Sequence, residues 1–363
     1  LHRKAFSTHK YDIGESHLVE MNIQLKTTEP QLQKYVPLPI GSREQVKEIL
    51  LQMEKHGIIR ECHEPSLFCS NLIVIKKKDK KSIRILLDAR LLNNATVRLP
   101  TIMVTRQEVL AHLMAKAYVS TIDLSDAFFH IAVNKKSQQY LTFYSESVGK
   151  RYTFQRAPQG CKNSPLFLKL LLDKVFHNME HCVLAYADDI IIATDGRLQE
   201  HLKIIDEVLK RLAAANLRIR PEKIILATET VEFLGIVWKK NTINIPKAKL
   251  ADFDRLASPT TPKKLKSIIC ALSFYRTFVP NFAGLSQALM EKSNLHHRQF
   301  QWTEEDEKQF RKLISTIQEY NSCHLPNPDK PYYVQSDASQ KAGGATIYLS
   351  LIHISEPTRL RRI

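Results

Sequence analysis

Two adjacent aspartates, Asp188 and Asp189, interrupt a stretch of apolar residues that runs from Cys182 to Thr194. Carboxylates at the ends of buried strands are costly to desolvate unless a partner compensates their charge, and a divalent cation is a natural partner. Neighbouring residues on a regular strand point to opposite faces, so only a tight turn lets both acids approach one site. The sequence therefore predicts two apolar strands joined by a very short turn, with Asp188 the better-placed metal ligand. An ordinary hairpin turn, which favours Asp for its backbone conformation, is the alternative.

A third acid, Asp123, ends another apolar strand that is predicted over Val119–Asp123. Two-metal phosphoryl transfer uses acids from separate strands to hold two divalent cations about 3.5–4 Å apart. Oxygen ligands of this kind suit Mg²⁺ or Mn²⁺. Asp126, three residues further on, is expected to cap a helix instead.

The charge of the chain indicates a polyanionic partner. Its formal net charge is +16 and its pI is about 9.5, which favours nucleic acid first and an anionic membrane surface second. No apolar run approaches the roughly 18 residues that span a bilayer, and the start has no secretory signal pattern. Six basic residues after the acidic hairpin are consistent with a solvated helix face: Lys203, Lys210, Arg211, Arg218, Arg220 and Lys223. The alternative is that they form, together with Lys239, Lys240, Lys247 and Lys249, a surface that follows a template–primer backbone.

The six cysteines include no CxxC pair. They are typical of a reduced intracellular protein with buried thiols, and not of a disulfide framework. Cys62, His63 and Cys69 lack the spacing of a zinc site, and no second pair of ligands follows them. The chain begins at Leu1 and not at Met, so we expect it to be part of a longer protein.

The hydrophobic pattern alternates strands and helices up to Pro246, changes to helices after it, and becomes strand-rich again from Pro331. This order predicts an α+β core, a helical region and the start of another domain. Strands are predicted at 71–75, 83–87, 119–123, 140–144, 182–186, 190–194 and 231–238. Helices are predicted at 42–57 and 105–116, both with capping boxes, and at 163–179, 197–215, 247–256, 263–278 and 303–319.

The segment Tyr186-Ala187-Asp188-Asp189 resembles the polymerase signature of reverse transcriptases. Further motifs of that family follow in the same order over roughly residues 1–349. They are the fingers motif at Ile83–Asn93, the first catalytic motif at Thr121–His130, the substrate-binding loop at Arg156–Pro165, the primer grip at Phe233–Gly235, and a segment at Leu272–Phe282 that is similar to gypsy-type LTR retrotransposons.

The resemblance implies a right-hand polymerase fold with fingers, palm and thumb, followed by a truncated RNase H-like domain. The implied organisation is an extended N-terminal lead-in at 1–41, fingers and palm at 42–240, a helical thumb or connection at 241–325, the start of the RNase H-like domain at 326–349, and a non-native tail at 350–363. The tail departs from the family pattern and looks like translated adapter sequence.

The resemblance also implies residue roles. Asp123, Asp188 and Asp189 are the expected catalytic acids and ligands of two Mg²⁺ ions, with Mn²⁺ as a substitute. The nucleotide contacts are expected from Lys78 and Arg84 at the triphosphate, Phe128 beneath the sugar, and Gln159 and Gly160 in the substrate-binding loop. The primer grip is expected at Phe233, Leu234 and Gly235.

Two of these roles have plainer alternatives, since Lys78 lies in a solvated lysine-rich hairpin tip and Phe128 fits simple core packing. Ala157 departs from the family pattern, which has a larger apolar residue there and a tighter pocket.

Asp337, within Gln335–Ser339, resembles the first RNase H acid. The family's other RNase H acids would lie downstream, so RNase H activity is not expected.

The expected activity is RNA-directed and DNA-templated DNA polymerisation by a fragment of a retroelement Pol polyprotein. Its partners would be an RNA template, a DNA primer and template, and deoxynucleoside triphosphates, in the cytoplasm or in virus-like particles. A non-catalytic nucleic-acid-binding remnant is the rival, and the three intact acids argue against it. Phe128 and the start of an RNase H-like domain argue against an RNA-dependent RNA polymerase.

Overall fold

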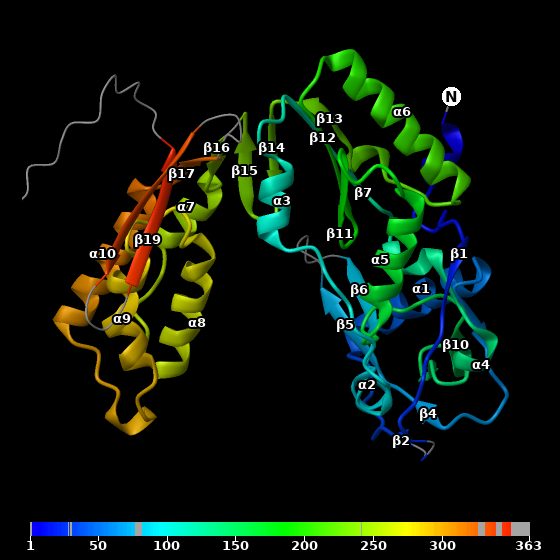
Figure 1. Cartoon of the computed structure of the whole chain (residues 1–363). Helices are drawn as coiled ribbons and strands as arrows, with labels where there is room; N and C mark the ends of the chain where they lie inside the picture. Colours follow the sequence, from blue (N-terminus) through cyan, green and yellow to red (C-terminus); the bar gives the residue numbers. More distant parts are fainter. Residues whose placement is uncertain are drawn as a thin grey trace, which may run out of the picture. The chain divides into compact units, whose positions relative to one another are not determined.

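The computed structural model describes residues 2–27, 29, 31–76, 82–240, 242–325, 331–338 and 343–349. The chain forms two compact units (Figure 1). The first unit comprises residues 1–112 and 118–227, and the second comprises 113–117 and 228–363. Among the described residues, no helix combines the length and apolar character needed to cross a bilayer.

A four-stranded sheet lies at the centre of the first unit. Its order is β11 (Val183–Tyr186), β12 (Asp189–Thr194), β7 (Tyr118–Asp123) and β13 (Ile225–Thr228). The first three strands are antiparallel to their neighbours, and β12 is buried from Ile190 onward. The apolar run read from the sequence therefore forms the edge strand β11 and the inner strand β12 of this sheet.

Two helices pack on this sheet. The helix α5 (Ser164–Val175) contacts β11, and α6 (Leu198–Ala214) contacts β12. The buried residues of α6 recur every three to four positions, which gives the helix one apolar face: His201, Ile205, Val208 and Leu212. The helix α5 ends at Val175, so its predicted extension to Met179 is wrong.

The rest of the first unit is built around α1 (Arg43–Lys55) and two further sheets. One sheet has the order β3 (Ile59–Glu61), β10 (Lys150–Phe154) and β9 (Thr142–Ser145), and the other pairs β5 (Leu72–Lys76) with β6 (Ile83–Leu87). The capping box predicted at Ser42 is wrong, because the Ser42 hydroxyl donates to the Pro39 carbonyl. The shorter elements are β2 (Gln31–Leu32), β4 (Phe68–Cys69), α2 (Arg90–Ala95), α3 (Arg106–His112), α4 (Lys135–Gln138) and the 3-10 turns at Arg3–Ala5, Ile40–Ser42, Ala127–His130 and Pro221–Lys223.

The capping box predicted at Thr105 and Glu108 is confirmed. The Glu108 carboxylate accepts hydrogen bonds from the Thr105 amide and hydroxyl, and the Glu108 amide donates back to Thr105. The helix that follows, α3, ends at His112 and not near Lys116.

The N-terminal segment is part of this unit and packs along it. Residues 16–21 form β1 (Ser16–Met21), which runs parallel to β8 (Ile131–Val133). Upstream of β1, the Ser7 amide donates to the Ile219 carbonyl, and the Ile219 amide donates to the Ala5 carbonyl. Residues 2–15, here called the N-terminal strap, are thereby paired with the chain that follows α6.

The second unit contains a sheet and a group of helices. The sheet has the order β14 (Thr230–Phe233), β15 (Ile236–Lys239), β16 (Thr242–Asn244) and β17 (Ser322–His324). The helices are α7 (Lys247–Asp254), α8 (Pro262–Leu272), α9 (Phe282–Ser293) and α10 (Glu304–Glu319), with 3-10 turns at Ser273–Tyr275 and His297–Gln299. A hairpin of β18 (Tyr332–Ala338) and β19 (Gly343–Leu349) follows, as the strand-rich pattern from Pro331 predicts.

The single strand predicted over 231–238 is wrong, because this segment is a hairpin. Leu234 and Gly235 both have positive φ angles, 48° and 71°, and reverse the chain between β14 and β15. The sequence prediction also missed α9, which begins after the left-handed Asn281.

Candidate active site

The acidic hairpin has the geometry that its sequence predicts. The strand β11 ends at Tyr186 and β12 begins at Asp189, and these two residues pair across a two-residue turn. Ala187 adopts a left-handed conformation in that turn, with φ of 54°. The turn leaves Asp188 exposed at the tip and starts Asp189 on the neighbouring strand.

Asp123 lies directly opposite Asp189 on the adjacent antiparallel strand. Opposed residues on such strands project to the same face, so the two carboxylates share one side of the sheet. Burial first, and then the charges of Asp188 and Asp123, together raise the pKa of Asp189 to about 6. The sheet therefore concentrates three acids that repel one another when all are ionised.

A lysine already compensates part of this charge. The Lys223 ammonium donates to both carboxylate oxygens of Asp123, at 2.9 and 2.8 Å. Lys223 ends a 3-10 turn, Pro221–Lys223, just after Arg220, whose guanidinium bonds Asp126 at 2.6 Å. The prediction that Asp126 caps a helix is wrong, because its side chain makes no cap bond to the turn that follows it.

Backbone pairing holds this basic segment against the end of β7. The Ser125 amide donates to the Arg218 carbonyl at 3.0 Å, and Leu124 bridges to Ile219. The Arg218 amide donates to Nε2 of His130 at 2.9 Å, while Nδ1 of His130 lies 3.2 Å from the Ala127 carbonyl. His130 is fully buried, and burial lowers its pKa to about 4, so the ring is neutral and can accept this bond.

Two of the residues expected at the nucleotide line one cavity of the same unit. Arg84 and Gln159 line it together with Asp126 and Phe129. Phe128 is partly buried and packs against the core of the unit. Lys78 lies outside the described residues.

Gly160 occupies a position that only glycine fits. Its φ angle is 107°, and a Cβ atom there would lie 2.6 Å from the Leu87 carbonyl oxygen. The Asn93 side chain donates to the Gly160 carbonyl at 2.8 Å, which fixes the loop against α2. Glycine at this position therefore lets the loop pack closely against the backbone at the end of β6.

The expected primer-grip residues lie in the second unit. Phe233 is buried at the end of β14, and Leu234 and Gly235 form the turn described above. A Cβ atom on Gly235 would come within 3.4 Å of the Phe274 ring. Asp337 lies on β18, opposite Gly344 of β19.

The described residues contain no group of three or more His, Cys, Asp or Glu side chains gathered closely enough to hold a metal ion. The carboxylates of the hairpin nevertheless fit a divalent cation in two respects. Their oxygens are the ligands that Mg²⁺ and Mn²⁺ prefer, and Asp123 already binds a cation, the Lys223 ammonium.

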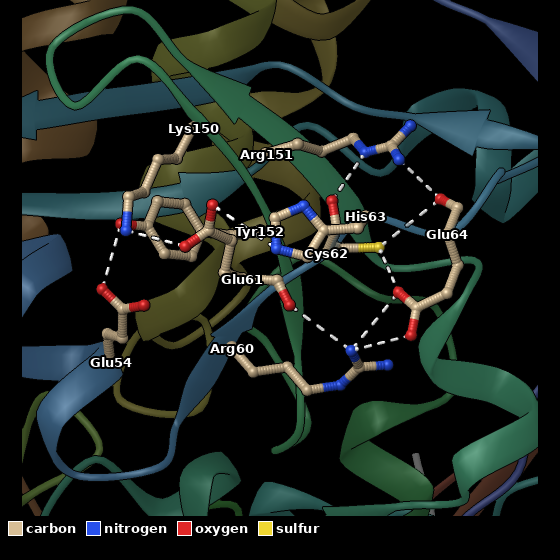
Figure 2. Close-up of polar contacts among 9 residues, drawn as sticks. All are labelled: Glu54, Arg60, Glu61, Cys62, His63, Glu64, Lys150, Arg151 and Tyr152. Atoms are coloured by element: carbon tan, nitrogen blue, oxygen red, sulfur yellow. Dashed lines mark hydrogen bonds and ion pairs between the residues drawn. The ribbon is translucent and has the colours of Figure 1, made fainter.

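The region of Cys62 and His63 does not form a zinc site either (Figure 2). The Cys62 thiol donates to the Glu64 carboxylate at 3.2 Å, and burial raises the pKa of that thiol. Arg60 also bonds Glu64, and Arg151 bonds the Cys62 carbonyl. The Arg151 contact joins β10 to the segment after β3, whereas the two Glu64 contacts are local to β3 and that segment.

Comparisons with known proteins agree with the motif order. Residues 75–238 match the family described as reverse transcriptase (RNA-dependent DNA polymerase), and residues 302–351 match the RNase H-like domain found in reverse transcriptase. The Gag-Pol polyprotein of Walleye dermal sarcoma virus is 28% identical over 345 residues, which cover 93% of this chain and 19% of that protein. The Pol polyprotein from the gypsy transposon of Drosophila melanogaster is 26% identical over 362 residues, which cover 95% of this chain and 34% of that protein. The chain thus spans about a fifth to a third of the length of these relatives.

Solved structures are similar over almost the whole chain. A foamy viral protease-reverse transcriptase in complex with double-stranded DNA superposes with a TM-score of 0.85 at 26% identity, over 95% of this chain and 60% of that one. A foamy viral complex with an RNA/DNA hybrid gives a TM-score of 0.82 at 25% identity, over 95% and 46% of the two chains. The predicted fold class, a right-hand α+β polymerase followed by an RNase H-like domain, is confirmed.

Proposed function

We propose that this chain, which carries a reverse transcriptase domain of the retrotransposon Pol type and an RNase H-like segment, is an RNA-directed DNA polymerase. It adds deoxynucleotides to the 3′-hydroxyl of a primer and also accepts DNA templates. The observation that carries this proposal is the pairing of Asp123 with Asp189 on adjacent strands, with Asp188 in the turn beside them.

Asp123, Asp188 and Asp189 would hold two Mg²⁺ ions, or Mn²⁺ in their place, which activate the primer hydroxyl and neutralise the leaving phosphates. Asp123 and Asp189 come from two paired strands of one sheet, so their backbone positions are rigid before substrate arrives. This rigidity lowers the entropy that must be lost when the reacting groups are positioned.

The cavity residues orient the nucleotide. Arg84 offers a forked set of donors that suits phosphate oxygens, and Gln159 is placed on the same cavity to contact the base or the template. In this proposal Gly160, which is exposed and has no side chain, brings its backbone close to the nucleotide. In this proposal Lys78 adds a further phosphate contact, and Phe233, Leu234 and Gly235 hold the primer.

Phe128 selects the sugar in this proposal. A rigid ring beneath the ribose leaves no room for a 2′-hydroxyl and offers it no hydrogen bond, so ribonucleotides would be disfavoured by both effects. The product is therefore DNA. The partners are an RNA template, a DNA primer and deoxynucleoside triphosphates. The similar foamy viral structures are complexes with double-stranded DNA and with an RNA/DNA hybrid, which supports this choice.

We also place the protein inside the cell, in the cytoplasm or in virus-like particles. All six cysteines are free thiols, which suits a reducing compartment.

The test is extension of a DNA primer on an RNA template with Mg²⁺, with deoxynucleotides and ribonucleotides supplied separately. The parent should extend with deoxynucleotides only. Asp188→Asn should lose at least about a hundredfold in single-turnover rate, which is near 2.7 kcal/mol of transition-state stabilisation, while its template–primer affinity stays unchanged.

The matched control is Asp173→Asn, because Asp173 lies exposed on α5 and pairs only with Lys169 among the contacts described. It should extend like the parent. A parent that binds template–primer without extending it would instead be a binding remnant, and extension by Asp188→Asn within tenfold of the parent would remove the catalytic role.

A further inference from the structure

The N-terminal strap, residues 2–15, is anchored at several points along its length. Arg156 donates to the Gly14 carbonyl at 3.2 Å and pairs with Glu15 at 2.7 Å. A Cβ atom on Gly14 would lie 1.7 Å from the Asn216 carbonyl oxygen, so the strap is packed directly on the chain that follows α6. The strap is therefore a fixed part of the first unit.

A turn in the middle of the strap presents Lys10 and Tyr11. Asp12 closes this turn by accepting hydrogen bonds from the Thr8 amide and hydroxyl, at 2.8 and 2.9 Å. The Tyr11 ring stacks on His56 at the end of α1, with 5.7 Å between ring centroids and 13° between planes. The Lys10 ammonium lies 5.0 Å from the centre of the Tyr11 ring. The turn is thus seated against α1.

This turn forms part of the wall of the cavity that Arg84 and Gln159 line. Lys10 and Tyr11 line that cavity, and they also line an adjoining groove that continues along α1 to Ser82. The strap therefore brings a residue from the start of the chain to the place where the sequence motifs predict the incoming nucleotide.

The charges on this cavity are unbalanced. Within the described part of the chain, neither Lys10 nor Arg84 has an ion pair with a carboxylate, whereas the one acid lining the cavity, Asp126, is paired with Arg220. Two uncompensated cations on one cavity favour an anionic ligand. A triphosphate is the anion that this position would meet.

We propose that Lys10 is a nucleotide-binding residue whose ammonium group contacts the triphosphate of the incoming deoxynucleotide beside Arg84. The proposal rests on the polymerase function proposed above. It extends the nucleotide site from the motif residues to the N-terminal strap, and Tyr11 is the support that seats Lys10 through its stack on His56.

The first experiment compares Lys10→Gln with Lys4→Gln. Both residues are exposed on the strap and both substitutions remove one positive charge, but Lys4 does not line the cavity. With saturating primed template, Lys10→Gln should raise the KM for deoxynucleotide about tenfold and change kcat little, as expected for loss of one charge-assisted contact. Lys4→Gln should match the parent, and Lys10→Arg should restore most of the affinity.

The second experiment measures binding without chemistry. The Kd for a deoxynucleotide is determined on a complex whose primer ends in a dideoxynucleotide, so that no bond can form. Lys10→Gln should weaken nucleotide binding about tenfold and leave the Kd for the primed template unchanged.

Three results would overturn the proposal. They are equal KM values for the parent and Lys10→Gln, equal losses in Lys10→Gln and Lys4→Gln, and a weaker Kd for primed template with unchanged nucleotide affinity. The last result would assign Lys10 to the nucleic-acid backbone. Each of these leaves the polymerase function standing, because that function is tested by primer extension in the parent.

Discussion

Asp189 shows how a single carboxylate is affected by its surroundings. Its pKa is raised from 3.8 to about 6, first by burial and then by Asp188 and Asp123. A group whose pKa is higher in the folded state adds stability below its unfolded pKa, and this contribution is lost as pH rises through about 6. Ionised Asp189 therefore lowers the free energy of unfolding of the metal-free protein at neutral pH.

We predict that Asp189→Asn raises the melting temperature of the metal-free protein at pH 7.5 and has much less effect at pH 4.5. The gain should be roughly 1–2 kcal/mol, because solvent screening of this partly exposed carboxylate reduces the full value of the shift. Thermal unfolding in the presence of a chelator checks this. The explanation fails if the two proteins differ equally at both pH values.

Among single residues, the three aspartates could be predicted from the sequence, and the lysine that pairs with Asp123 could not. Asp123, Asp188 and Asp189 stand out because acids that interrupt apolar strands are rare and costly. Lys223 carries no such local signal, since it is one lysine among many in a basic stretch. Only the folded chain shows that it lies on Asp123, 100 residues away in sequence.

Among the structural elements, the segment 217–223 supplies the positive charge that offsets the charge of Asp123 before any metal binds. Its backbone pairs with residues 124–125, and its last residue, Lys223, bonds both oxygens of Asp123. A metal ion that binds Asp123 must displace this ammonium or accept its repulsion.

We predict that Lys223→Gln binds Mn²⁺ more tightly than the parent, by about three- to tenfold, in the absence of nucleic acid and nucleotide. The reason is that the variant loses both a competing cation and its charge. Titration of free Mn²⁺ by electron paramagnetic resonance measures this directly. Lys240→Gln is the matched control, because Lys240 forms an exposed pair with Glu229. Unchanged or weaker Mn²⁺ binding by Lys223→Gln would contradict the displacement argument.

Prediction of the elements failed where single residues adopt unusual backbone conformations. The strand predicted over 231–238 is a hairpin because Leu234, which is not a turn residue by type, has a positive φ angle. The helix α9 was missed because Pro280 and Asn281 indicate a break, whereas the left-handed Asn281 caps a new helix by accepting from the Gly284 amide. The long amphipathic α6 was predicted within one residue at each end, because its apolar face is continuous.

On the scale of the whole molecule, charge governs binding. The net charge of +16 predicts that affinity for primed template falls steeply with salt, because lysine and arginine contacts release counterions. For a footprint of about five phosphates on duplex, the slope of log affinity against log salt should be near −4 to −5. Fluorescence anisotropy between 50 and 200 mM salt checks this, and a flat response would leave the positive charge without its proposed partner.

The overall fold could be predicted because several motifs in a fixed order restrict the topology far more than any one of them. The place of the strap could not, because residues 1–41 have no strong periodicity and their contacts lie far along the chain. Long-range pairing of this kind leaves little trace in a local pattern.

The strap also has a consequence for the way the protein is made. The residues of the strap leave the ribosome well before their partners: His2 bonds Asp206, and the Lys4 carbonyl accepts from Arg218, 214 residues further on. Loops of this length close slowly, since entropy must be lost before any contact stabilises them. The wall of the cavity therefore cannot be completed until the chain as far as Arg218 has emerged, and the strap must wait for partners that are translated long after it.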